Sequence, residues 1–254
     1  MDRLVYTSLS SASTQELQRI RLNHDLSNLA TVGYKQTGKS TFEAAFVDGP
    51  GFPSRYQPIM SADGDAVDMT PGPISHTGNG MDIAMDNKTV LGVQAADGSI
   101  AFTRRGDLRV TSTGLVETGN GYLVMGEGAP VTVPIGSMVT LTPDGSVYAS
   151  TAGNEGGQSQ LVGQLMLRDA SIQRLVRRDD GLFEPVGPDG PVEDFASGPL
   201  PASVTVGALE GSNVNPIEVM VSLLDMYRSF ETQMKIIHDA DQADADGNQM
   251  MALP

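Results

Sequence analysis

The stretch that decides the fold is SNVNPIEVMVSLLDMYRSFETQMKIIHDADQ, residues 212–242. Asn215 is a favourable helix N-cap, and Pro216 suits the first helical position, where a backbone N–H has no partner anyway. Glu218 stands three residues after Asn215, as in a capping box. The pattern therefore predicts a helix that begins at Pro216 and runs to about His238, a length of about 35 Å at 1.5 Å per residue.

An apolar stripe runs along this predicted helix. Its members alternate between spacings of three and four residues and are Met220, Leu223, Tyr227, Phe230, Met234 and Ile237. Such a stripe, sustained over about three heptads, is typical of a coiled-coil seam. Val221, Leu224 and Ile236 lie outside the stripe, so the helix carries apolar residues on more than one face.

The start of the chain predicts a second helix, over residues 3–30. Leu22, Leu26 and Leu29 repeat at helical spacing, and Gly33 is the type of residue that ends a helix in a left-handed turn. A free helix with this pattern would be marginal in water, because helix stability comes mostly from a packed face. Neither terminal helix has a core of its own.

Between the two helices the pattern changes to short runs rich in Val, Ile and Thr, separated by glycine and proline. Tight turns are predicted at Thr113-Gly114, Asn120-Gly121 and Pro143-Asp144-Gly145. Short strands with this punctuation predict a mainly antiparallel β domain.

The predicted fold class is therefore α+β, with N- and C-terminal helices that pair as a coiled coil and a β domain between them. The expected division is an N-terminal helix in 1–35, an extended connector in 36–70, a β-rich domain in 71–206 and a C-terminal helix in 207–254. A helical hairpin within one chain is one form of this pairing. It would leave apolar residues of both helices uncovered, so copies of the same chain are the simplest further partners.

Composition narrows the choice of partners. The net charge of −15 disfavours nucleic acid and anionic membranes, which would repel the chain. The absence of cysteine excludes disulfides and thiolate nucleophiles. No run approaches the roughly 20 apolar residues of a membrane span, and the first residues lack the apolar core of a cleavable signal peptide. We therefore expect no direct membrane insertion.

No catalytic, metal or cofactor site is predicted. His24, His76 and His238 lie far apart on different predicted elements. The acidic segment 239–249 fails as a calcium loop, because Gly247 in the sixth position leaves neither the first nor the twelfth position acidic. No nucleophile–base pair stands out. The protein is therefore expected not to be an enzyme.

Two terminal signatures identify a family. HDLSNLATVGYK, residues 24–35, resembles the helix end Asn-Asn-Leu-Ala-Asn-Val-x-Thr-x-Gly-Phe-Lys of the flagellar rod, hook and hook-associated axial proteins. LEGSNVNPIE, residues 209–218, resembles their Leu-Glu-x-Ser-Asn-Val-x-Pro-x-Glu, and AFTRRGDLRVTSTGLV, residues 101–116, resembles a strand pair of the family. One departure is His24-Asp25, which replaces the usual Asn-Asn.

The resemblance implies a structural subunit of the flagellar basal-body rod. Three segments, 68–74, 93–99 and 126–134, are most similar to the proximal-rod member. A distal-rod or hook-type axial protein is the alternative within the family. A soluble carbohydrate-binding or enzymatic β domain is the alternative outside it, and would be a stable monomer with a closed polar pocket.

The family's architecture also implies partners and a location. Its terminal helices line an inner tube, its β domain forms the outer layer, and the tube is a drive shaft that spans the periplasm. Expected partners are other rod proteins, copies of the same chain, and the export apparatus during secretion. The expected assembly interface comprises Leu22, Leu26, Asn28, Leu29, Met220, Leu223, Tyr227, Phe230, Met234 and Ile237.

Overall fold

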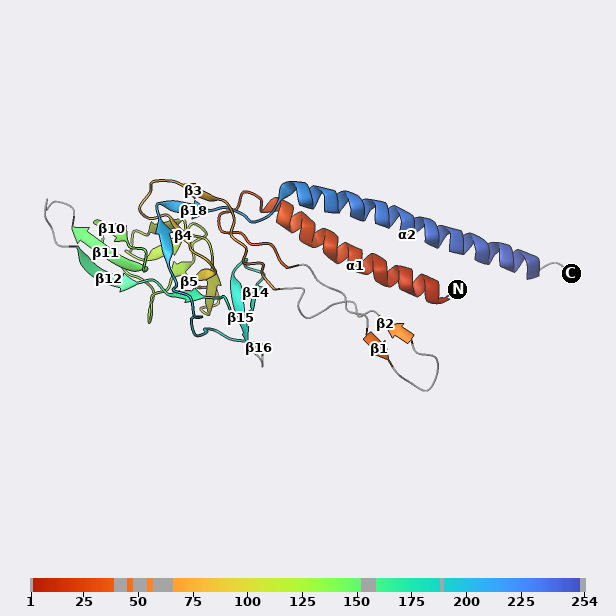
Figure 1. Cartoon of the computed structure of the whole chain (residues 1–254), viewed down its shortest axis with the longest axis horizontal. Helices are drawn as coiled ribbons and strands as arrows, with labels where there is room; N and C mark the ends of the chain where they lie inside the picture. The colour runs from red at the N-terminus through yellow and green to blue at the C-terminus, as the bar shows by residue number, and fades with distance from the viewer. Residues whose placement is uncertain are drawn as a thin grey trace. The chain divides into compact units, whose positions relative to one another are not determined.

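The computed structural model describes residues 2–38, 45–47, 54–56, 66–151, 159–187 and 190–251 (Figure 1). By their contacts, the residues divide into two compact units. We call the first the helical unit; it comprises Met1–Asn28, Ser40–Ser61 and Asn215–Pro254. We call the second the β unit; it comprises Leu29–Lys39 and Ala62–Val214.

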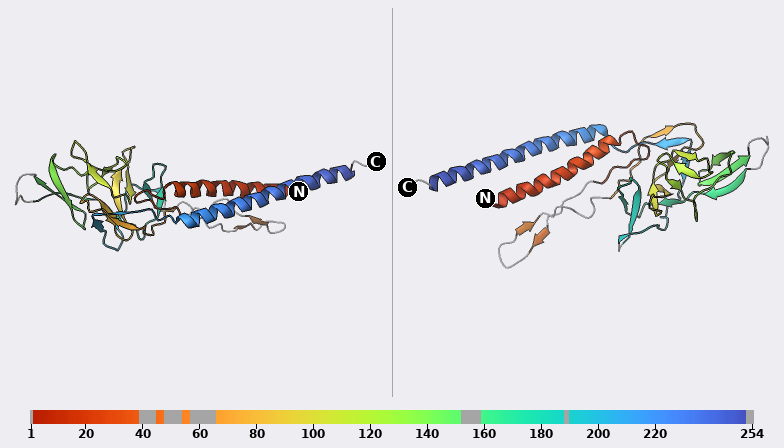
Figure 2. Two further views of the ribbon diagram at one scale, coloured as in Figure 1. Left: turned by 90° about the horizontal axis from the view of Figure 1, so that it is seen from above. Right: turned by 180° about the vertical axis from the view of Figure 1, so that it is seen from behind.

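The helical unit contains two long helices, α1 (Asp2–Ser27) and α2 (Pro216–Met251). The two helices contact each other, and Figures 1 and 2 both show them side by side. The unit also holds a short antiparallel pair, β1 (Ala45–Val47) with β2 (Ser54–Tyr56), which the sequence patterns did not predict.

α1 ends at Ser27, three residues before the predicted end. The Asn28 backbone N–H reaches the carbonyls of His24 and Asp25, and its side-chain Nδ2 donates to the His24 carbonyl at 2.9 Å. A terminal carbonyl is thus satisfied by a side chain at the end of the helix. Gly33 does have a left-handed φ of 68°, but the prediction that it ends the helix is wrong, because α1 has already ended.

The predicted start of α2 is confirmed. Asn215 Oδ1 accepts the backbone N–H of Ile217 at 3.0 Å and that of Glu218 at 3.5 Å. The helix runs past His238 to Met251, so it is longer than predicted. The acidic segment 239–249 contains no proline and several alanines, and therefore continues the helix.

The β unit is built from short strands joined in antiparallel pairs. The largest sheet has nine strands, in the order β14-β15-β6-β5-β9-β8-β7, with β13 on β5 and β16 on β15. Its strands are β5 (Thr89–Gln94), β6 (Ile100–Thr103), β7 (Leu108–Val110), β8 (Val116–Thr118), β9 (Leu123–Val124), β13 (Leu167–Asp169), β14 (Leu175–Arg177), β15 (Phe183–Gly187) and β16 (Gly190–Pro191).

A second sheet has three strands, β10 (Ser137–Leu141), β11 (Ser146–Thr151) and β12 (Gln160–Gln164). The predicted turns are confirmed: Gly114, Gly121 and Gly145 all have positive φ and each lies between two antiparallel strands. The mainly antiparallel β architecture with one helix at each end of the chain is therefore as expected.

Two further ladders join the beginning of the β unit to its end. β3 (Ile74–His76) pairs with β18 (Ala208–Glu210), and β4 (Ile83–Met85) pairs with β17 (Val204–Val206). Segments more than a hundred residues apart thus become neighbours, which places residues 29–35 and 209–214 of the two signatures within one unit.

Two apolar clusters form the core of the β unit. The larger gathers buried aliphatic side chains of both sheets, including Leu91, Val93, Val124, Val147 and Leu165. The smaller surrounds Phe102 and Phe183. Burial of an aliphatic side chain stabilises a fold by about 1.5–3 kcal/mol, so these clusters are the main favourable contribution to the unit.

Candidate assembly surfaces

The contact between α1 and α2 uses one face of α2. Among the α2 residues whose burial is described, those at least partly buried lie mostly three, four or seven residues from one another, which places them on one face: Val219, Ser222, Leu223, Met226, Gln233 and Ile237. Gln15 of α1 donates through Nε2 to Ser229 Oγ at 2.8 Å, which adds a polar contact between the two helices.

This face is displaced from the predicted seam. Leu223 and Ile237 belong to both stripes and are half-buried. Met220, Tyr227 and Met234 of the predicted seam are exposed instead. Their neighbours one residue earlier take the covered positions, a rotation of about 100° around the helix.

Outside the covered face, the described part of α2 also exposes large apolar side chains to solvent. We call this set the exposed stripe: Ile217, Met220, Val221, Leu224, Tyr227, Phe230 and Met234. Met220 is 54 % exposed and Tyr227 is 56 % exposed. A surface helix normally directs polar residues away from its covered face, so apolar side chains at these positions indicate an interaction surface.

The predicted residues near the end of α1 are half-buried: Leu22, Leu26, Asn28 and Leu29. Leu17 and Ile20, which the prediction did not include, are exposed at 41 % and 56 %. They lie beside the stripe defined by Leu22 and Leu26, among the apolar residues that a single helix pair was expected to leave uncovered. Both terminal helices therefore combine a covered face with exposed apolar side chains.

The signature segments themselves meet at a buried cluster of charges in the β unit. Lys35, Arg104 and Glu210 are each no more than 1 % exposed. Lys35 Nζ lies 2.6 Å from Glu210 Oε1, and Arg104 Nε donates to Glu210 Oε2 at 2.7 Å. One carboxylate thus holds a cation from each of two distant segments.

Backbone groups complete this cluster. Arg104 also donates to the carbonyls of Met85, Asn87 and Thr89, while the Gly72 N–H donates to Glu210 Oε1 at 2.9 Å. Burial, together with the nearby charge of Arg104, lowers the pKa of Lys35 from its ordinary value, and the bond to Glu210 opposes that shift. Removal of one partner would leave a buried charge uncompensated.

Asn213 and Arg177 make further contacts in the same region. Asn213 Oδ1 accepts the Gln36 N–H at 2.7 Å, and its Nδ2 donates to the Asp68 carbonyl at 3.0 Å. Arg177 donates to the Lys35 carbonyl, and its guanidinium lies 4.2 Å from the centre of the Tyr34 ring. The signature residues therefore serve the closure of the β unit as well as the ends of the helices.

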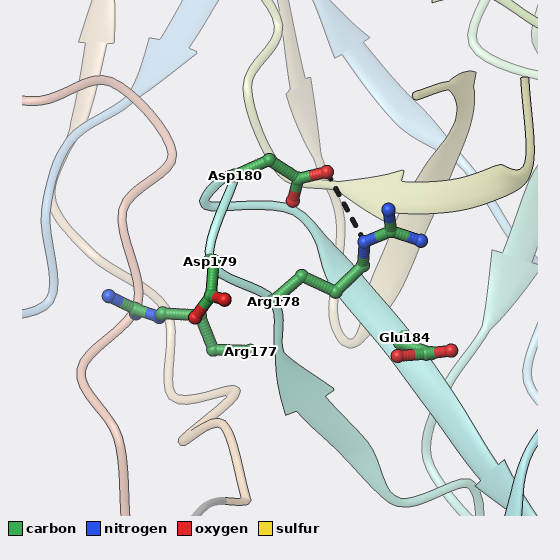
Figure 3. A pocket seen from close by; sticks show the side chains of 5 residues that line it. All are labelled: Arg177, Arg178, Asp179, Asp180 and Glu184. Carbon is green, nitrogen blue, oxygen red and sulfur yellow. Dashed lines mark ion pairs between the residues drawn. The ribbon is translucent and has the colours of Figure 1, made fainter. Parts of the chain in front are cut away.

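A shallow depression of about 520 Å³ lies beside β14 and β15. Its lining is Arg177, Arg178, Asp179, Asp180 and Glu184 (Figure 3). Arg177 and Arg178 point in opposite directions, as successive strand residues do. Arg178 is held by Asp180 at 3.2 Å and by Asp97 at 2.8 Å, so its charge is used within the fold.

Neither helix has an apolar run that could cross a membrane, as judged over the described residues. Within the same ranges, no three His, Asp or Glu side chains come together in a way that could hold a metal ion. Apolar helix faces, rather than a chemical centre, are the prominent candidate site.

Two family models match the chain. Residues 84–149 match the model described as the flagellar hook protein FlgE/F/G D1 domain, and residues 205–250 match the flagellar basal body rod FlgEFG protein C-terminal model. The β unit and α2 thus both match models of flagellar rod and hook proteins.

Curated relatives cover the whole chain. The flagellar basal-body rod protein FlgF of Salmonella typhimurium strain LT2 is 35 % identical, and that of Escherichia coli strain K12 is 34 % identical, each with all of both chains covered. FlgG of Agrobacterium fabrum strain C58 is 27 % identical, with 86 % of this chain and 88 % of FlgG covered. The chain therefore belongs to the FlgF family of flagellar basal-body rod proteins.

Membership settles the class of function. The chain is a structural subunit of the flagellar basal-body rod, located in the flagellar basal body, and not an enzyme. Membership in this family also implies assembly with other rod proteins.

Proposed function

We propose that the chain polymerises through its terminal helices into the proximal part of the rod, and that the resulting tube transmits torque to the hook. α1 and α2 then pair as a coiled coil, and the exposed stripe of α2 docks onto helices of neighbouring subunits. Those neighbours are copies of the same chain and other rod proteins. Before assembly, the subunit is a substrate of the flagellar export apparatus.

One observation carries this proposal: α2 has apolar side chains on two faces, and its contact with α1 covers one of them. Burial of an exposed apolar side chain contributes about 1.5–3 kcal/mol, so several such contacts per subunit suffice to drive association. The net charge of −15 opposes that association, and the apolar contacts have to exceed the repulsion.

The proposal assigns a role to each part of the chain. Residues 1–35 and 207–254 form the tube, residues 71–206 form the outer domain, and residues 36–70 connect them. Most of the connector lies outside the described residues. The ten predicted interface residues remain the proposed contacts, with Leu223 and Ile237 facing α1 and with Met220, Tyr227 and Met234 facing neighbouring subunits.

A pair of substitutions separates the two faces of α2. Tyr227→Asp places a charge in the exposed stripe and should leave the contact with α1 intact. Leu223→Asp places a charge in the covered face and should disturb both the helix pair and assembly. Thr232→Asp is the control, because Thr232 is an exposed polar residue of the same helix.

Sedimentation velocity over a range of concentrations measures association, and far-ultraviolet circular dichroism measures helix content. The parent chain and Thr232→Asp should associate with increasing concentration. Tyr227→Asp should keep its helix content and weaken association by more than tenfold, since a buried tyrosine contributes about 2 kcal/mol. Equal association of Tyr227→Asp and Thr232→Asp would contradict the proposal, as would normal motility of cells that carry Tyr227→Asp.

A further inference from the structure

The tetrapeptide Thr-Gly-Asn-Gly occurs twice in the β unit, at residues 77–80 and 118–121. An asparagine followed by glycine is prone to spontaneous deamidation, because glycine has no side chain to shield its backbone nitrogen. Both asparagines and both of the glycines that follow them are exposed to solvent. Sequence and exposure therefore do not distinguish the two copies, and the difference between them lies in their hydrogen bonds.

The second copy holds its glycine nitrogen in a hydrogen bond. The Gly121 N–H donates to the Thr118 carbonyl at 2.8 Å, which closes a β-turn with Asn120 in its third position. The nitrogen can attack a carbonyl carbon only after its N–H has released the proton to solvent. A proton that is held by a carbonyl oxygen is withheld from solvent, so this turn protects Asn120.

The first copy forms its turn in a different register. The Asp82 N–H donates to the Asn79 carbonyl at 3.0 Å, so Asn79 begins the turn and Gly80 takes its second position. The N–H of that position lies outside the hydrogen bond that closes a β-turn. Within the part of the chain that the structure describes, the Gly80 N–H donates to no acceptor. A Cβ at Gly80 would meet nothing within 4 Å, so the space beside this residue is open.

The Asn79 side chain folds back onto the same turn. Its Oδ1 accepts the Met81 N–H at 3.2 Å, which is an Asx-turn. The ring that this bond closes contains both the side-chain Cγ and the Gly80 nitrogen, so the two reacting atoms are held in one small ring. The Met81 N–H also withdraws electron density from the side-chain carbonyl, which makes Cγ the better electrophile.

We propose that Asn79 is a site of spontaneous deamidation and that Asn120 is its protected counterpart. The Gly80 nitrogen loses its proton to water and forms a bond to Asn79 Cγ. The bond between Cγ and Nδ2 then breaks, and Nδ2 takes up a proton and leaves as ammonia. Water opens the resulting cyclic imide at either of its carbonyls, which leaves aspartate or isoaspartate at position 79.

The product changes the surroundings of the turn. Asn79 Nδ2 donates to Asp82 Oδ1 at 3.0 Å, and Asp82 is buried. A carboxylate at position 79 has no N–H to donate and faces the Asp82 carboxylate with like charge. Isoaspartate in addition lengthens the main chain by one methylene group between β3 and β4. Both products therefore disfavour the native turn.

The turn lies where the β unit closes. The Thr77 and Gly78 N–H groups donate to the Gly207 carbonyl at 2.9 and 3.1 Å, and the Gly207 N–H donates to the Asp82 carbonyl at 2.8 Å. The strands on either side, β3 and β4, pair with β18 and β17. Deamidation thus weakens the contact that joins the beginning of the β unit to its end. It requires nothing from the terminal helices, so it is independent of the proposed function.

The duplicated tetrapeptide supplies its own control. The full-length protein is incubated in mildly alkaline buffer made with heavy-oxygen water, and the conversion of each asparagine is followed by mass spectrometry of its peptide. We expect Asn79 to convert several-fold faster than Asn120 in the folded chain. In urea, where neither turn persists, the two rates should be similar. Equal rates in the folded chain would overturn the proposal, and so would the same preference for Asn79 in urea.

A substitution at Gly80 tests the route of the reaction. Gly80→Ala shields the nitrogen without a clash, since the added Cβ meets nothing within 4 Å. It should slow conversion of Asn79 several-fold and leave both the rate at Asn120 and the thermal unfolding of the β unit unchanged. An unchanged rate at Asn79 would contradict attack by the Gly80 nitrogen.

The effect of the product is measured separately. Asn79→Asp reproduces one product and should lower the unfolding midpoint of the β unit by about 2–4 °C. Asn120→Asp, in the second copy of the tetrapeptide, is the control for added charge and should lower the midpoint less. Equal midpoints for the two variants would overturn the proposed effect on closure of the β unit.

Discussion

The β unit buries charged side chains, whereas the helical unit exposes apolar ones. The β unit takes charged side chains into its interior and surrounds them with partners: Glu210, Lys35 and Arg104 are buried and bonded to one another. The helical unit leaves apolar side chains in solvent along α2 from Ile217 to Ile236. The comparison teaches that the β unit pairs its buried charges within one chain, while the exposed apolar faces of the helices are suited to contact with further chains.

The difference follows from how each unit is built. In the β unit, ladders between β3 and β18 and between β4 and β17 bring both signature segments to the same place. Lys35 and Glu210 are 175 residues apart in sequence and 2.6 Å apart in space. Two helices in contact, by contrast, cover only one face of each other, so the remaining faces stay exposed.

The largest expected effect comes from removal of the Glu210 carboxylate, which binds both Lys35 and Arg104. Glu210→Ala would leave Lys35 and Arg104 buried without their anion, and we expect it to lower the free energy of unfolding of the β unit by about 3–5 kcal/mol. Urea unfolding followed by circular dichroism measures the change. Glu117→Ala is the control, because its partner Arg109 is largely exposed and the pair contributes about 0–1 kcal/mol. Equal losses in the two variants would remove the distinction between buried and surface charges.

Two glycines of the β unit with left-handed backbones, Gly33 and Gly78, test what a close contact between distant segments contributes to stability. Gly33 and Gly78 have φ of 68° and 73°, so alanine at either position carries a backbone penalty of about 1–2 kcal/mol. A Cβ at Gly33 would also lie 2.2 Å from the Arg104 carbonyl oxygen, whereas a Cβ at Gly78 meets nothing within 4 Å. Gly33→Ala should therefore be the more destabilising by about 1–3 kcal/mol in thermal or urea unfolding. Equal effects would show that the close approach at Gly33 is relieved at no cost.

The smallest expected effect lies in the helical unit. Asn215→Ala removes the acceptor for two N–H groups at the start of α2 and should destabilise the helix by about 1 kcal/mol. If the helical circular dichroism is lost at a lower temperature while the unfolding transition of the β unit stays in place, the two units respond separately. Asp225→Asn is the control within α2, since Asp225 lies 3.8 Å from Arg228 and both side chains are exposed. A concerted shift of both transitions by Asn215→Ala would contradict independent units.

Local patterns predicted much of the fold. Asn215-Pro216 located the start of α2 because capping depends on neighbouring residues, and the glycine turns located three junctions between strands for the same reason. The end of α1 was placed too late, since Gly33 lies beyond the helix, at a point where the Arg104 backbone comes too close to leave room for a Cβ. The pairing of the first and last strands could not be predicted, because partners of a strand are chosen across the whole chain.

The candidate surfaces were likewise predicted only in part. The spacing of Leu223 and Ile237 indicated a helix seam, and both residues are half-buried. The pattern did not reveal that Met226 rather than Tyr227 is covered, because both belong to apolar stripes of similar quality. Nothing in the residues around Lys35, Arg104 and Glu210 indicated a buried cluster, since a charged side chain in sequence is more often solvated.

By itself, the sequence determined the types of element, the cap that starts α2, the turns between several strands, and the two signatures of the flagellar axial family. These features depend on residues close together in the chain, where spacing and backbone preference act directly. Only the tertiary structure decided which face of α2 is covered, which strands close the β unit, and which charges are buried. Those outcomes depend on contacts between residues far apart in the chain, and the free energy of such a contact exists only once the chain has brought its members together.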